Sequence, residues 1–289
     1  MRGLTYHVRE WGPVGAPQLW LLHGWMDVSA SFQFVVDELQ HDWHVLAPDW
    51  RGFGSTTAPA GADCYWFPDY LADLDLLLDA FASEQAGEDK RVRIVGHSMG
   101  GNIALLYAGV RPQRLAALVN LEGYGMRDVA ADEVPGRYGR WIDELKDPPG
   151  LRDYASLDDV ARRLQHNNPR LRADRAAFLA PHWARPRPDG RYELAADAAH
   201  RIINPVPYRW ADVAACWKRI DCPVLWIDAA DSDAPRHAGG VDEVARRVEH
   251  LARVTVVRVA DAGHMLHHDQ PRAVAQVIED FLRRHPAGG

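Results

Sequence analysis

Short apolar runs alternate with amphipathic stretches along most of the chain. Runs of this kind, bounded by Gly, Pro or Asp, are typical of strands buried on both faces of a parallel sheet. They occupy residues 18–22, 44–48, 91–95, 115–121, 223–227 and 254–259. In the stretch 70–81, by contrast, Leu71, Leu74 and Leu78 recur at helical spacing. The alternation predicts βαβ units, and hence an α/β fold whose central, mostly parallel sheet has helices on both faces.

The strand pattern lapses over residues 126–217. This segment is rich in Arg, Asp and Pro, and it contains short helical stretches such as 157–165 but no run typical of a strand. We therefore predict that residues 1–125 and 218–289 form the α/β core and that residues 126–217 form an inserted helical cap.

A serine lies at the junction between a predicted strand and a predicted helix. Gly96-His97-Ser98-Met99-Gly100-Gly101 directly follows the run 91–95 and fits the pattern G-x-S-x-G. In a nucleophile elbow of this pattern, a sharp turn strains the serine backbone, and glycines on either side avoid clashes. Because a strand precedes the motif and a helix follows it, we predict that Ser98 is a nucleophile rather than part of an ordinary turn.

Two further segments provide the groups that such a nucleophile needs. His264 lies in a loop after the last predicted strand, from which a histidine base can reach back to Ser98. Acyl transfer also needs two N–H groups directed at the developing oxyanion. We predict that these are the backbone amides of Trp25, in the loop after the first buried strand, and of Met99. His23 is predicted to hold that loop rather than to transfer protons.

Together these motifs resemble those of the capped α/β-hydrolase superfamily. The matching pieces are His23-Gly24-Trp25, Asp49-Trp50-Arg51-Gly52-Phe53-Gly54-Ser55, Gly96-His97-Ser98-Met99-Gly100-Gly101 and Gly263-His264. They extend over nearly the whole chain except the cap. The resemblance implies an α/β-hydrolase fold and a serine hydrolase of the esterase or lactonase kind, which uses a Ser-His-acid triad.

The acid of this triad has more than one candidate. A carboxylate must reach the ring nitrogen of His264 that faces away from Ser98. The loop after Ile227 offers Asp231 and Asp233, although Ser232 stands where the family pattern places the acid. The neighbouring strand offers Glu122, at the position where haloalkane dehalogenase-like relatives carry their acid. The sequence favours Asp231 over Glu122, with Asp233 as the third alternative.

Composition and charge exclude several other classes of protein. The net charge of −7 argues against a nucleic-acid partner. No apolar run approaches the length of a membrane span, and the first residues lack the apolar stretch of a secretory signal. Three scattered cysteines do not form a disulfide framework. We therefore expect a cytoplasmic protein without a membrane span.

No cofactor is expected either. The segments Gly52-Phe53-Gly54 and Gly123-Tyr124-Gly125 lack the third glycine of a dinucleotide fingerprint, and the chain has no P-loop. His267 and His268 next to Asp269 are interpreted as a helix start rather than a metal site, because no partner motif for a metal exists.

The expected activity is hydrolysis of a carboxylic ester of a small, partly apolar substrate. Trp141, Trp183 and Trp210 of the cap either line its pocket or anchor the packing of the cap. Lactonase, carbon–carbon hydrolase and aminopeptidase activities share the triad and remain alternatives. A dehalogenase or epoxide hydrolase is disfavoured, because such relatives carry Asp where this chain has Ser98. A non-hydrolytic ligand receptor is the rival from another class. The sequence leaves the oligomeric state open.

Overall fold

The computed structural model describes residues 1–84 and 89–286, and its main sheet has seven strands in the order β1-β3-β2-β4-β5-β9-β10. The strands are β1 (Val8–Trp11), β2 (Gln18–Leu22), β3 (His44–Pro48), β4 (Val92–His97), β5 (Leu115–Leu121), β9 (Val224–Ala229) and β10 (Val254–Val259). Neighbouring strands are parallel except β1, which pairs antiparallel with β3 at one edge. The predicted parallel sheet is confirmed, since each of the apolar runs lies in one of its parallel strands.

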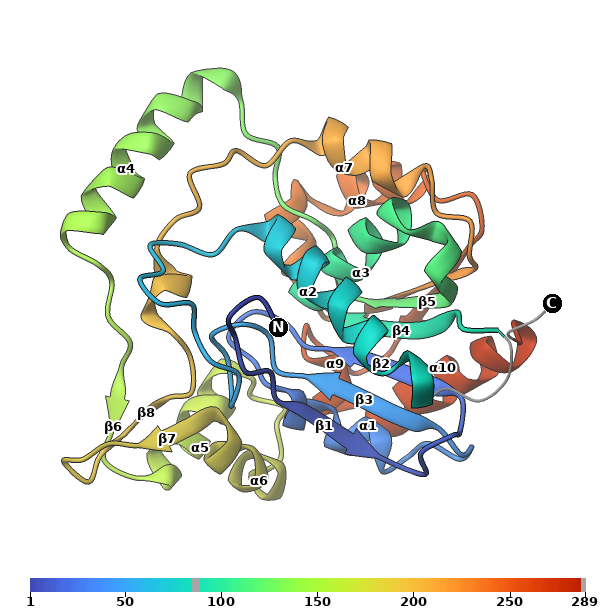
Figure 1. The fold of residues 1–289 in the computed structure, drawn as a ribbon, viewed down its shortest axis with the longest axis horizontal. Coiled ribbons are helices and arrows are strands. Elements are labelled where there is room, and N and C mark those ends of the chain that lie inside the picture. The colour runs from blue at the N-terminus through green and yellow to red at the C-terminus, as the bar shows by residue number, and fades with distance from the viewer. Residues whose placement is uncertain (85–88, 287–289) are drawn as a thin grey trace.

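Helices cover both faces of this sheet (Figure 1). One face carries α2 (Phe67–Ala80), α3 (Met99–Val110), α7 (Trp210–Trp217) and α8 (Val241–Val248), and the other carries α1 (Gln33–Val36), α9 (Leu266–Asp269) and α10 (Pro271–Arg284). Side chains of β2 alternate between the two cores: Trp20 and Leu22 pack under α2 and α3, whereas Leu19 and Leu21 pack against α10. Strands buried on both faces explain why these runs are continuously apolar.

Residues 126–217 fold largely outside the main sheet (Figure 1). They form α4 (Val134–Lys146), α5 (Leu157–Asn167) and α6 (Ala173–Trp183), together with a small sheet of β6 (Asp153–Tyr154), β7 (Ala184–Pro186) and β8 (Tyr192–Leu194). The small sheet is a difference from the prediction of a segment without strands. Strands of two or three residues are too short to show an alternating pattern.

The end of this segment packs with the core rather than with α4 to α6. Val213 and Trp217 of α7 belong to the main hydrophobic cluster, and the Trp217 ring meets Trp226 of β9 edge-on at 5.7 Å. The part of residues 126–217 that packs outside the core therefore ends before α7, and α7 itself belongs to the core.

The cap segment contacts the core at the carboxyl ends of the parallel strands. Ala195 accepts a hydrogen bond from the backbone of Gly54, in the loop after β3, at 2.7 Å. Asn168 donates to Asp269, in α9 beyond β10, at 2.8 Å. In open α/β sheets, the carboxyl ends of the strands are where ligands bind. Residues 126–217 thus contact the core at the edge at which the predicted site residues should meet.

Candidate active site

Ser98 lies in a strained turn between β4 and α3. Its backbone has φ 51° and ψ −114°, a conformation that L-residues rarely adopt, and its N–H donates to the carbonyl of Leu121 at 2.8 Å. A Cβ on Gly96 would lie 2.4 Å from the carbonyl oxygen of Gly100, and one on Gly100 would lie 2.1 Å from that of Leu22. Glycine is therefore required at both positions, and the turn has the geometry of a nucleophile elbow.

His264 lies directly beside this serine. Its Nε2 is 3.0 Å from Ser98 Oγ, so the ring is within hydrogen-bond distance of the hydroxyl proton. The loop that carries it is fixed on both sides. Asp269 accepts a hydrogen bond from the backbone of Gly263 at 2.9 Å, and His97 Nε2 lies 2.8 Å from the His264 carbonyl oxygen. The imidazole of His264 is partly exposed.

Glu122 is the carboxylate that the structure brings to His264. It follows β5 directly, has φ 58°, and places Oε2 3.1 Å from His264 Nδ1, with its side chain fully buried. The carboxylate also accepts hydrogen bonds from the backbone of Ala229 at 2.7 Å and from the Ser232 hydroxyl. The phenol of Tyr124 donates to it at 2.5 Å. A buried carboxylate needs such partners, and Glu122 has four.

The two aspartates considered from the sequence lie elsewhere. Asp231 Oδ2 accepts from Arg170 at 2.8 Å, and its side chain is about half exposed, at 47%. Asp233 pairs with Arg236 at 2.7 Å and is 69% exposed. Within the described residues, neither carboxylate contacts His264. The loop after β9 instead turns Ser232 inward, toward Glu122, so the preference for Asp231 does not fit the geometry.

Sequence reasoning missed Tyr124, which joins two carboxylates. Its hydroxyl lies 2.5 Å from Glu122 Oε1 and 2.9 Å from Asp228 Oδ1. Burial raises the pKa of Tyr124, and the charges of both carboxylates raise it further. Burial also raises the pKa of Asp228. The signal that was available is the position of the two carboxylates: Glu122 directly follows β5, and Asp228 lies near the end of the neighbouring strand β9.

The loop after β2 approaches the nucleophile closely. A Cβ on Gly24 would lie 3.2 Å from the Ser98 Cβ, which places the following amide of Trp25 near the serine. Met99 is the first residue of α3, and the first amides of a helix have no acceptor within the helix. His23 holds this loop as predicted: its Nε2 accepts from the Trp50 amide at 2.9 Å, and burial lowers its pKa.

The cap tryptophans differ in their surroundings. Trp210 meets Trp217 edge-on at 5.1 Å, and the Arg247 guanidinium lies 4.6 Å from its ring centre. Trp141 packs on a small cluster around Ile202, and Trp183 packs between α5 and α6. All three therefore make packing contacts.

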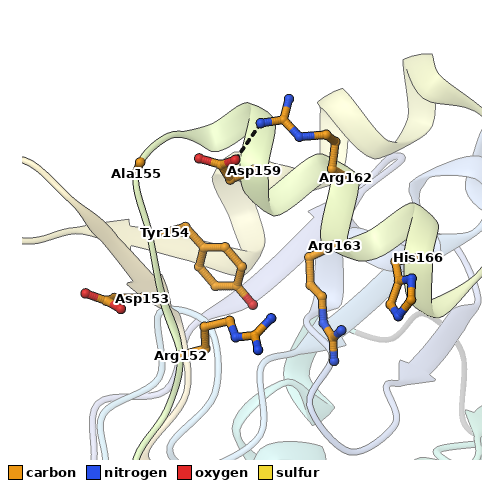
Figure 2. A pocket seen from close by; sticks show the side chains of 8 residues that line it. All are labelled: Arg152, Asp153, Tyr154, Ala155, Asp159, Arg162, Arg163 and His166. Carbon is orange, nitrogen blue, oxygen red and sulfur yellow. Dashed lines mark hydrogen bonds and ion pairs between the residues drawn. The ribbon is translucent and has the colours of Figure 1, made fainter.

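A hollow of about 490 Å³ opens within residues 126–217 (Figure 2). It is lined by Arg152, Asp153, Tyr154, Ala155, Asp159, Arg162, Arg163 and His166. Arg162 is paired with Asp159 at 2.5 Å. Another hollow, of about 550 Å³, lies near the amino ends of β5 and β9, beside residues such as Leu115 and Pro223. The side chains that line the hollow within residues 126–217 are mostly charged.

Among the residues that the structure describes, two clusters have side chains of the kind that bind metal ions. Asp27, His267 and His268 are all buried, whereas Glu10, His44 and Glu84 lie at the edge of the sheet. In each cluster the potential ligand atoms lie within 4.8 Å of one another. His267 and His268 thus meet Asp27, not Asp269. None of the helices in the described part of the chain has the length and apolar run needed to cross a membrane.

The site combines a strained serine, a histidine within hydrogen-bond distance of it and a buried carboxylate. All three lie at the carboxyl edge of a mainly parallel sheet, and this arrangement defines a class of hydrolytic enzymes. The chain belongs to the alpha/beta hydrolase fold family, whose sequence profile matches residues 17–271. The family and the fold predicted from the sequence are thereby confirmed.

Individual relatives agree with this assignment. The chain is 27% identical to a serine hydrolase-like protein of Danio rerio, over 94% of this chain and 83% of that protein. It is 26% identical to epoxide hydrolase 3 of Siraitia grosvenorii, over 98% and 96% of the two chains. A hypothetical protein of Pseudomonas aeruginosa PAO1 superposes with a TM-score of 0.86 at 23% identity, over 98% of both chains. The relatives support a hydrolase, and they differ in the bond that their names describe.

Proposed function

We propose that this protein is a serine hydrolase that cleaves a carboxylic ester of a small, partly apolar substrate through an acyl-enzyme. The observation that carries the proposal is the continuous chain of contacts from Ser98 Oγ to His264 Nε2, at 3.0 Å, and from His264 Nδ1 to Glu122 Oε2, at 3.1 Å. In this proposal Ser98 is the nucleophile, His264 the base, and Glu122, rather than Asp231, the acid.

The reaction proceeds in two halves. Ser98 Oγ attacks the ester carbonyl carbon while His264 Nε2 takes the hydroxyl proton, and the amides of Trp25 and Met99 donate to the oxyanion. The intermediate collapses when the C–O bond to the alcohol breaks, and His264 returns the proton to that alcohol. Water then attacks the acyl-enzyme by the same route. Glu122 stays ionised throughout and accepts the Nδ1–H of His264, which fixes the ring tautomer.

Serine at position 98 separates this proposal from epoxide hydrolysis. An epoxide hydrolase of this fold uses a carboxylate nucleophile, whereas this chain presents a hydroxyl with a base beside it. The same serine, histidine and carboxylate can also hydrolyse lactones and carbon–carbon bonds next to a ketone. These substrates are alternatives within the proposal. We assign residues 126–217 as the cap over this site, and we expect the protein to act in the cytoplasm.

Covalent labelling and turnover test the proposal directly. A fluorophosphonate should modify Ser98, identified by peptide mass spectrometry, and Ser98→Ala should abolish both labelling and turnover while thermal unfolding stays unchanged. A panel of 4-nitrophenyl esters of increasing acyl length, with lactones, aminoacyl amides and an epoxide alongside, defines the bond cleaved. An active Ser98→Ala protein, or an unsubstituted protein that turns over only the epoxide, would contradict the proposal. Ligand binding without any turnover would favour a receptor.

A further inference from the structure

Asp27 is a buried carboxylate outside the proposed triad, in the loop that carries Trp25. It is 3% exposed. Its Oδ1 accepts from the amide of Val28 at 2.8 Å and from the Ser31 hydroxyl, so one carboxylate oxygen fixes the local turn. The other oxygen, Oδ2, has no hydrogen-bond partner among the described residues. A buried charge without a partner is costly, so this oxygen needs a positive or donating neighbour.

That neighbour is His267. Its Nε2 lies 3.8 Å from Asp27 Oδ2, a distance for an ion pair rather than for a direct hydrogen bond. Burial acts to raise the pKa of Asp27, but its interactions with the neighbouring imidazoles of His267, His268 and His23 outweigh burial, and the pKa lies below its usual value. Asp27 is therefore an anion in the folded protein, and it faces an imidazole that is fully buried.

His267 is connected to the base through His97. The ring centres of His267 and His97 are 4.3 Å apart, and His97 Nε2 lies 2.8 Å from the carbonyl oxygen of His264. Burial holds the pKa of His97 well below its usual value, so the ring is neutral and donates Nε2–H to that carbonyl. His267 also belongs to α9, three residues after His264, so its position and that of the base are tied by the chain as well.

We propose that Asp27 and His267 are a positioning pair that fixes the loop of the oxyanion donor Trp25 relative to the loop of the base His264. Asp27 is two residues from Trp25, and His267 is three residues from His264. The two loops come from opposite ends of the chain, after β2 and after β10, and the pair joins them. The inference rests on the proposed function, since positioning matters only if both loops serve one reaction.

The cluster also contains His268, and with it the residue types of a transition-metal site. His268 packs against the His267 ring at 4.2 Å, and its pKa is held well below the usual value by burial. The two interpretations differ in what a purified protein contains. A positioning pair predicts full activity after chelation and no stoichiometric metal, and a metal site predicts the reverse.

The test compares Asp27→Asn and His267→Asn with a matched control. Glu279→Gln also removes a buried carboxylate with a histidine partner, since Glu279 accepts from His41 Nδ1 at 3.1 Å, but it lies on α10 away from the site. Small displacements of catalytic groups cost rate, so each of the first two variants should lower kcat by about 10²-fold. KM should stay within about threefold, and the double variant should be no worse than the singles, because the two side chains act as one unit. Glu279→Gln should lower thermal stability and leave kcat unchanged.

Two outcomes would overturn the proposal that Asp27 and His267 are a positioning pair. In the first, Asp27→Asn and His267→Asn have the same kcat as Glu279→Gln, and all three variants lose a similar amount of thermal stability. The other is one equivalent of zinc in the purified protein that disappears in Asp27→Asn, with activity lost on chelation. A second readout is independent of turnover: the downfield proton resonance of His264 Nδ1–H should shift in Asp27→Asn and not in Glu279→Gln. Failure of the proposed function would instead show as an unsubstituted protein that cleaves no ester.

Discussion

Replacement of Glu122 by glutamine tests which of the three carboxylates that the sequence left open acts with His264. All the polar neighbours of this carboxylate donate: Ala229 N–H at 2.7 Å, the hydroxyls of Tyr124 and Ser232, and His264 Nδ1. Glutamine offers one acceptor oxygen and an NH₂ group that can only donate. If the NH₂ faces His264, it forces the ring into the tautomer with Nε2–H, which cannot take the proton of Ser98.

The magnitude follows from this tautomer change. Asp→Asn in a Ser-His-Asp triad lowers kcat about 10⁴-fold, equivalent to about 5.5 kcal/mol, with the geometry intact. We expect a loss of that order for Glu122→Gln. Mismatched donors around the buried amide should also lower the free energy of unfolding by about 1–3 kcal/mol. Asp231→Asn is the matched control, because the half-exposed pair with Arg170 contributes about 0–1 kcal/mol and does not contact the base.

The assay is kcat on an activated ester for Glu122→Gln, Asp231→Asn and Asp233→Asn, with urea unfolding of each variant. Because unfolding alone also abolishes activity, kcat is compared at a temperature where every variant is folded. The assignment of Glu122 as the acid would be refuted if Asp231→Asn lost most of its kcat while Glu122→Gln stayed active.

Three further predictions concern the surroundings of the site. His200 stacks between Phe53 and Tyr65, and burial lowers its pKa to about 3. The unfolded chain takes up a proton below about pH 6.5 and the folded chain does not, so urea unfolding should show stability falling by about 1.4 kcal/mol per pH unit from there toward pH 3, and His200→Phe should lack this contribution. Gly24→Ala presses a methyl group within 3.2 Å of the Ser98 Cβ, so kcat should fall more than thermal stability does. Trp210→Ala should lower the melting temperature and leave the acyl-length preference unchanged, because this ring packs on the core.

The main sheet was predictable because its strands are buried on both faces. Each of its parallel strands coincides with an apolar run, to within two residues at either end. The edge strand β1 was not predicted, because its four residues are mostly half-buried and lack such a run. The strands β6 to β8 were not predicted for a related reason. Two or three residues show no alternating pattern, and their pairing depends on segments that meet only in the folded chain.

Ser98 and His264 were predictable because local sequence dictates their positions. A strained turn requires glycines around Ser98, and a loop after the last strand carries His264. The carboxylate that faces His264 was not predictable, because its identity depends on how two neighbouring strands align. Leu121, the last residue of β5, pairs with Ile227 of β9, so Glu122 comes at the level of Asp228, which still lies in β9. Only the backbone direction at Glu122, with its positive φ, decides which carboxylate faces the base.

The same alignment makes relocation of the acid a final prediction. Ser232 donates to Glu122 Oε2, the oxygen that faces His264 Nδ1 at 3.1 Å, so a side chain at position 232 is already next to the base. Ser232→Asp in a Glu122→Gln background should therefore place a carboxylate near Nδ1 and restore about 10-fold or more of the lost kcat, since the correct tautomer is again favoured.

Two controls make this prediction specific to charge. Ser232→Asn in the same background has nearly the same shape without the charge, and it should restore nothing. Ser232→Asp with Glu122 retained puts two carboxylates in one buried site, which raises the pKa of one of them and should lower stability near neutral pH. If Ser232→Asp rescues no better than Ser232→Asn, the loop after β9 does not reach the base. The contact between Ser232 and Glu122 would then be structural, and Glu122 would be the acid because only the end of β5 can supply one.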